Sequence, residues 1–104
     1  MSQGNYSLLP QIAILGAGGF VGSRMVEVFH LTGTAKVIPV VRRVPAMARL
    51  SRFDLDIAIA DTRDSDRLAE ALRGCSAVID CTVGMPNDIE AAARALLQIG
   101  RAHV

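Results

Sequence analysis

The sequence predicts an α/β protein in which short parallel strands alternate with helices. Two observations support this prediction. Short apolar runs rich in Val, Ile, Leu and Ala are each followed by a stretch with helical spacing of apolar residues. In addition, 51% of the residues are hydrophobic but only 4% are aromatic, which is typical of parallel strands buried on both faces. A length of 104 residues allows one domain at most.

Four apolar runs have the length and composition of strands. We expect these strands at Ile12–Leu15, Val37–Val41, Asp56–Ala60 and Ala77–Cys81. The second run contains Pro39, which cannot donate a hydrogen bond to a neighbouring strand. Proline is therefore expected at a sheet edge or a bulge. Asp61 closes the third run.

The segments between and after these runs have helical spacing. We expect helices at Phe20–Leu31, at Pro45–Arg52, from Asp64 or Ser65 to Gly74, and from Asn87 to Gly100. Their inward side chains should be Val21, Met25, Val28, Phe29, Met47, Leu50, Leu68, Leu72, Ile89, Ala92, Ala93, Leu96 and Leu97. Gly33 and Gly74 end two of the helices. Arg101–Val104 has the composition of the first residues of a fifth strand.

Strand–helix–strand connections of this length are right-handed and give a parallel sheet with helices on both faces. The expected strand order is 3-2-1-4, with the topological switch point between strands one and four. A ligand would bind there, at the carboxyl ends of the strands, beside Gly16–Gly22 and Thr82–Gly84.

A glycine-rich turn joins the first strand to the first helix. Gly16, Gly19 and Gly22 are spaced three apart, and Gly18 adds a fourth glycine. Glycines allow such a turn to approach a ligand closely, and the following helix directs its free N–H groups and its positive dipole end there. The segment Gly16–Gly22, which includes Phe20 and Val21, is therefore a candidate pyrophosphate-binding site. The alternative is that the glycines only form a turn.

Three segments resemble the short-chain dehydrogenase/reductase superfamily, in particular its extended or atypical branch of NAD(P)-dependent epimerase/dehydratase-like proteins. The turn Gly16–Gly22 is similar to that branch's GxxGxxG motif, with Gly18 where Thr is common. Asp61-Thr62-Arg63-Asp64 resembles the Asp-Leu-Arg-Asp segment after strand three, and residues 68–80 resemble the passage into strand four. The resemblance implies a Rossmann-type NAD(P)-binding fold.

The resemblance also implies roles for residues outside the glycine turn. Asp61, with Thr62 beside it, would reach the adenine amino group. Thr82, Val83 and Gly84 would pass the cofactor ribose. A purely structural role is the alternative for Asp61, Thr82 and Gly84. Asp80 lies within an expected buried strand, and the sequence assigns it no role.

The residues after strand two bear on the choice of cofactor. An NAD site of this type usually carries an acid about 20 residues past the glycine turn, where it binds the ribose 2′-hydroxyl. Here that position holds Arg42, followed by Arg43, and no acid occurs between Glu27 and Asp54. Guanidinium groups suit a 2′-phosphate. The sequence thus favours NADP over NAD, unless the two arginines are simply a solvated surface pair.

The usual chemistry of the superfamily requires a Tyr with a Lys four residues later. This sequence has one tyrosine, Tyr6, and one lysine, Lys36, and they cannot form that pair. No residue is assigned as catalytic or as a metal ligand. We therefore expect the chain to be a partial domain, truncated at the start of strand five and lacking the catalytic half.

Three functions remain open. The first is the NAD(P)-binding segment of an NADP-preferring oxidoreductase or epimerase/dehydratase-like enzyme. The second is a non-catalytic NADP(H)-sensing module, and the third is a small module that dimerises through strand four or helix four. A net charge of +1 and the lack of a long apolar run argue against nucleic acid or a membrane as partner. With Cys75 and Cys81 expected as reduced, buried thiols, the predicted location is cytoplasmic.

Overall fold

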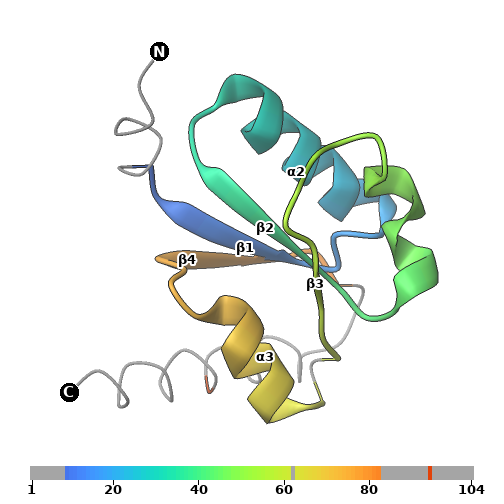
Figure 1. Ribbon diagram of the computed structural model, residues 1–104, viewed down its shortest axis with the longest axis vertical. Coiled ribbons are helices and arrows are strands. Elements are labelled where there is room, and N and C mark those ends of the chain that lie inside the picture. Colours follow the sequence, from blue (N-terminus) through green and yellow to red (C-terminus); the bar gives the residue numbers. More distant parts are fainter. Residues whose placement is uncertain (1–8, 62, 83–93, 95–104) are drawn as a thin grey trace.

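A computed structural model describes residues 9–61, 63–82 and 94. Within this part of the chain the elements are β1 (Gln11–Leu15), α2 (Phe20–Thr32), β2 (Lys36–Val41), η1 (Val44–Leu50), β3 (Ala58–Ile59), α3 (Ser65–Leu72) and β4 (Ala77–Asp80) (Figure 1). The strands form one parallel sheet in the order β3-β2-β1-β4. The predicted fold class and strand order are therefore confirmed. The expected helix at 87–100 and strand at 101–104 lie outside the described residues.

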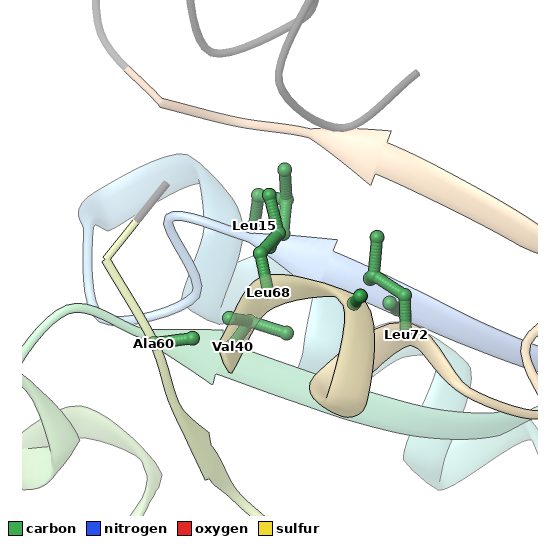
Figure 2. Close-up of a cluster of buried hydrophobic side chains, with 7 residues drawn as sticks. Leu15, Val40, Ala60, Leu68 and Leu72 are labelled. Carbon is green, nitrogen blue, oxygen red and sulfur yellow. The ribbon is translucent and has the colours of Figure 1, made fainter. Parts of the chain in front are cut away.

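Helices cover both faces of the sheet, with α3 on one face and α2 and η1 on the other (Figure 1). Successive side chains of a strand point to opposite faces, so the sheet contributes to two hydrophobic clusters. The cluster under α3 contains Ala13, Leu15, Val40, Ala60, Leu68, Ala69 and Leu72, and Figure 2 shows Leu68 and Leu72 directed at the sheet. The cluster under α2 and η1 contains Ile14, Ala17, Val26, Val37, Val41 and Leu50.

The buried face of α2 is the predicted one in part. Met25 and Phe29 pack against the cluster beneath the helix, as expected. Gly22 and Val26 are the buried residues of this helix, whereas Val21 and Val28 are 64% and 47% exposed. The apolar spacing alone did not distinguish these neighbouring stripes. The close approach of Gly22 to the glycine turn fixes the rotation of the helix and turns Val21 outward.

The expectation that Pro39 lies at an edge or a bulge is wrong. Pro39 is fully buried and pairs with Ile14 in the interior strand β2. The Lys36 N–H donates to the Pro10 carbonyl on the β1 side, and the Val41 carbonyl accepts from Ala60 on the β3 side. Because bonding directions alternate along a strand, the missing N–H of Pro39 faces β3, not β1.

Pairing between β2 and β3 begins only after this proline, at Val40 and Ala58. The position of the missing donor therefore precedes the first hydrogen bond between β2 and β3, so no hydrogen bond between these strands is lost. For the same reason β3 comprises only Ala58–Ile59 instead of the predicted Asp56–Ala60. The expected helix at Pro45–Arg52 is the 3₁₀ segment η1, which buries Leu50 as predicted.

Helix α3 forms as the sequence predicts. The Asp64 carboxylate caps it by accepting a hydrogen bond from the Arg67 N–H, and the helix stop at Gly74 has the left-handed φ of +84°. The two cysteines are free thiols and half-buried. No helix within the described residues is long and apolar enough to cross a membrane.

Candidate cofactor-binding site

The glycine-rich turn lies at the carboxyl end of β1. Gly16 has a left-handed φ of +71°, and a Cβ there would lie 2.9 Å from the Cys81 carbonyl carbon and from the Thr82 nitrogen. The turn is held by hydrogen bonds from the Ala17 N–H to the Val40 carbonyl and from the Gly19 N–H to the Gly16 carbonyl. Gly16 thus brings the turn directly against the chain that leaves β4.

The turn leads into α2 with equally close packing. A Cβ on Gly22 would lie 2.8 Å from the Gly16 carbonyl carbon and closer still to its oxygen. The N-cap residue Gly19 provides no side-chain cap, and the first turn of α2 contains no acid. The first N–H groups of a helix have no acceptor within the helix, so this end of α2 presents unpaired donors and the positive end of the helix dipole. Both features suit a phosphate.

Phe20 and Val21, which begin α2, are 81% and 64% exposed. Gly18 is placed differently from its neighbours in the turn. A Cβ on Gly18 would lie 2.7 Å from the Ala46 methyl carbon, and closer still to the Ala46 carbonyl oxygen. The side of Gly18 where a side chain would lie is therefore packed against η1.

The end of β4 forms the second wall beside the turn. The Asp80 carboxylate accepts hydrogen bonds from both the backbone N–H and the hydroxyl group of Thr82. This local turn gives Asp80 a role that the sequence did not reveal, because it fixes Thr82 beside Gly16. Burial raises the pKa of the Cys81 thiol, and the negative charge of Asp80 raises it further. Val83 and Gly84 lie outside the described residues.

Arg42 and Arg43 follow directly after β2, and both are exposed. In the described part of the chain, neither guanidinium group forms a hydrogen bond or an ion pair. Arg43 is also the N-cap residue of η1. The pair thus presents two available cations at the carboxyl edge of the sheet.

Asp61, at the end of the β3 segment, forms a two-pronged ion pair with Arg63. Its Oδ2 is 2.8 Å from Arg63 Nη2, and its Oδ1 accepts from Arg63 Nε at 3.1 Å and from the Arg63 backbone N–H at 2.9 Å. These hydrogen bonds lower the pKa of Asp61 to about 2, with a smaller contribution from the charge of Arg42. Thr62 lies outside the described residues.

Sequence reasoning did not predict the Asp61–Arg63 pair. The available signal was the Asp-x-Arg spacing after a strand, because an Asp in a turn commonly accepts from the backbone two residues later. Within the described residues, Asp61 Oδ2 accepts one hydrogen bond, from Arg63 Nη2, so this oxygen can also accept one from a ligand.

The carboxyl ends of the parallel strands meet at one edge of the sheet, where the glycine turn also lies (Figure 1). The structure therefore brings together the glycine turn, Thr82, the arginine pair and Asp61 along this edge. This end of the sheet thus carries unpaired N–H donors at the start of α2 and two exposed cations at the arginine pair.

Comparison with known proteins agrees with this geometry. Residues 12–101 match the model of the NAD dependent epimerase/dehydratase family. A search of curated protein sequences returned no match.

Several solved structures have a similar fold. A nucleoside-diphosphate-sugar epimerase from Pseudomonas aeruginosa has a TM-score of 0.75 and 24% identity over 88% of this chain and 30% of its own. An NADPH-dependent quinone oxidoreductase from Escherichia coli, in complex with NADPH, has a TM-score of 0.73 and 24% identity over 86% of this chain and 33% of its own. A triphenylmethane reductase from Citrobacter sp., in complex with NADP(H), has a TM-score of 0.68 and 20% identity over 86% of this chain and 34% of its own.

This chain thus spans about a third of the length of these three proteins. Their likeness shows the Rossmann-type fold, and the family match covers most of the sequence. On this evidence the chain belongs to the NAD dependent epimerase/dehydratase family.

Proposed function

We propose that this chain binds the adenosine part and the pyrophosphate of a nicotinamide dinucleotide and prefers NADP(H) to NAD(H). The observation that carries the proposal is the uncapped amino end of α2, which follows a turn in which Gly16, Gly18 and Gly22 leave no room for side chains. Backbone N–H groups at such a helix end bind phosphate oxygens without competition from a neighbouring carboxylate.

Each part of the edge has a separate task in this proposal. The N–H groups of Phe20, Val21 and Gly22 donate to the pyrophosphate. Thr82, held by Asp80, lies beside the ribose together with Val83 and Gly84. Asp61, with Thr62, accepts from the adenine amino group. The nicotinamide ring of the bound dinucleotide would supply hydride transfer, whereas these residues hold the adenosine part and the pyrophosphate.

The preference for NADP(H) rests on Arg42 and Arg43. A 2′-phosphate offers acceptor oxygens to two guanidinium groups that form no hydrogen bond or ion pair in the described part of the chain, whereas a 2′-hydroxyl does not need them. Two structures of similar fold were solved as complexes with NADPH and NADP(H), which supports a nicotinamide dinucleotide with this phosphate.

The proposed context is an NADP-preferring oxidoreductase or epimerase/dehydratase-like enzyme whose cofactor-binding segment is this chain. Lys36 begins β2 and thus lies at the amino ends of the parallel strands, opposite the end that carries the glycine turn. The second function, NADP(H) sensing without catalysis, uses the same binding site. It differs in predicting cofactor binding without turnover.

The test is a calorimetric titration of the purified chain with NADPH, repeated with Gly22→Ala. A Cβ at Gly22 would collide with the Gly16 carbonyl, so we expect binding to fall at least about tenfold. Gly33→Ala is the control, because Gly33 also has a positive φ but has no atom within 4 Å of its would-be Cβ. Unchanged binding by the folded Gly22→Ala variant would contradict the proposal.

A further inference from the structure

The 3₁₀ segment η1 rests on the glycine turn and on α2 at three points. At its start, Ala46 packs against Gly18. In its last turn, the Arg49 guanidinium lies over the Phe20 ring, 5.6 Å from its centroid. Just beyond it, Arg52 Nη2 is 2.9 Å from Glu27 Oε2. The segment is thus fastened along the exposed side of α2.

The contact at Gly18 is the tightest of the three. A Cβ at this position would lie 2.7 Å from the Ala46 methyl carbon and within 3.0 Å of the Ala46 carbonyl group. Backbone atoms cannot move aside as the end of a flexible side chain can. Any side chain at position 18 must therefore push η1 away from the turn.

The same segment determines where the arginine pair lies. Arg43 is the N-cap of η1, and its carbonyl accepts a 3.0 Å hydrogen bond from the Ala46 N–H. Ala46 thus contacts Gly18 on one side and is bonded to Arg43 on the other. Arg42 is the next residue back along the chain, at the end of β2.

We propose that Gly18 is a specificity-determining position, which seats Ala46 and so holds Arg42 and Arg43 at the distance from the pyrophosphate turn that a 2′-phosphate requires. The inference rests on the proposed NADP(H) function. It assigns Gly18 to positioning of the arginine pair through η1, and Glu27 to a supporting role at the other end of that segment.

The proposal predicts a change in selectivity as well as in affinity. Both NADPH and NADH need the pyrophosphate turn, but only NADPH needs the arginine pair. If Gly18 were merely structural, Gly18→Ala would weaken both cofactors equally. If it seats η1, NADPH binding should fall about tenfold or more while NADH binding changes less than about threefold.

Calorimetric titrations with NADPH and NADH would be run on the unmodified chain, Gly18→Ala and Glu27→Gln. Glu27→Gln weakens the attachment of Arg52 and should lower the NADPH/NADH affinity ratio by a smaller factor. Arg24→Gln is its matched control, because Arg24 also pairs with Glu27 but lies within α2 itself, whereas Arg52 lies just after η1. This control should keep the ratio of the unmodified chain.

Equal loss of both cofactors in Gly18→Ala, or no loss, would overturn the inference if the unmodified chain prefers NADPH. If Gly18→Ala does not fold, an unchanged ratio in Glu27→Gln would overturn it. If the unmodified chain shows no preference for NADPH, the proposed cofactor preference fails, and the inference fails with it.

Discussion

Replacement of both Arg42 and Arg43 by Ala tests the proposed 2′-phosphate site. Both guanidinium groups are exposed, and neither has a hydrogen bond or ion pair with the rest of the described chain, so their removal should leave the fold intact. A hydrogen bond to a charged partner contributes about 1.5–3 kcal/mol. At an exposed site we expect the lower end for each arginine, which gives about 3 kcal/mol for the pair.

This loss corresponds to an NADPH affinity lower by about two orders of magnitude. NADH lacks the 2′-phosphate, so its affinity should change less than about threefold. Isothermal titration calorimetry with each cofactor measures both values directly. The control is the double substitution Arg67→Ala and Arg73→Ala. These two residues are exposed, lie on and just after α3, and their replacement removes the same amount of charge from another surface. Equal weakening of NADPH and NADH, or equal weakening by the control, would refute the reasoning.

Three further predictions concern stability and reactivity. Leu68→Ala should lower the free energy of unfolding by about 3 kcal/mol in urea denaturation, because Leu68 is fully buried between α3 and the sheet. Replacement of the exposed Leu31 by Ala should cost less than about 0.5 kcal/mol, and equal costs would contradict the packing described. The pKa of Asp61 is lowered to about 2 from 3.8, so its ion pair stabilises the fold above about pH 4 and this contribution is lost as the pH falls toward 2. Asp61→Asn should therefore cost about 1 kcal/mol at pH 7 and much less at pH 2, where about half of the Asp61 carboxyl groups are protonated, and a cost independent of pH would exclude this cause. Burial raises the pKa of the Cys75 thiol, so it should react with iodoacetamide at pH 8 more slowly than free cysteine; an equal or faster rate would show that the thiol is not shielded.

Much of the fold could be predicted because local and long-range signals agreed. The apolar runs located the four strands, although the third is shorter than predicted. Gly33, Gly74 and the Asp64 cap each indicated a helix end that the structure confirms. Strand order followed from the chain's alternation of strands and helices together with the handedness of their connections.

The errors arose where a residue's effect depends on its neighbours in space. Pro39 was expected at an edge because the sequence does not show which side of a strand its missing donor faces. The rotation of α2 was predicted only in part: Met25 and Phe29 face the core as expected, but Gly22, which has no side chain, determines that Val21 and Val28 do not. A prediction from helical spacing considers only the apolar side chains, and it therefore placed Val21 and Val28 on the buried face although both are exposed.

The candidate site was predictable in part for similar reasons. The glycine turn and the positions of the arginine pair could be read from spacing. Three other contacts could not be read from spacing: the ion pair of Asp61 with Arg63, the hydrogen bonds of Thr82 to Asp80, and the packing of Ala46 on Gly18. The first two depend on the conformation of a short turn, and the third on packing between segments that are distant in the sequence. Residue composition and spacing do not determine either.

The most direct test of the central claim is an amide NMR titration of the chain with NADP⁺. Binding of the pyrophosphate at the amino end of α2 predicts the largest shifts at the backbone N–H groups of Phe20, Val21 and Gly22, with smaller shifts at Arg42 and Arg43. Saturable shifts confined to α3, or no shifts at millimolar NADP⁺, would contradict the claim that this turn binds the cofactor.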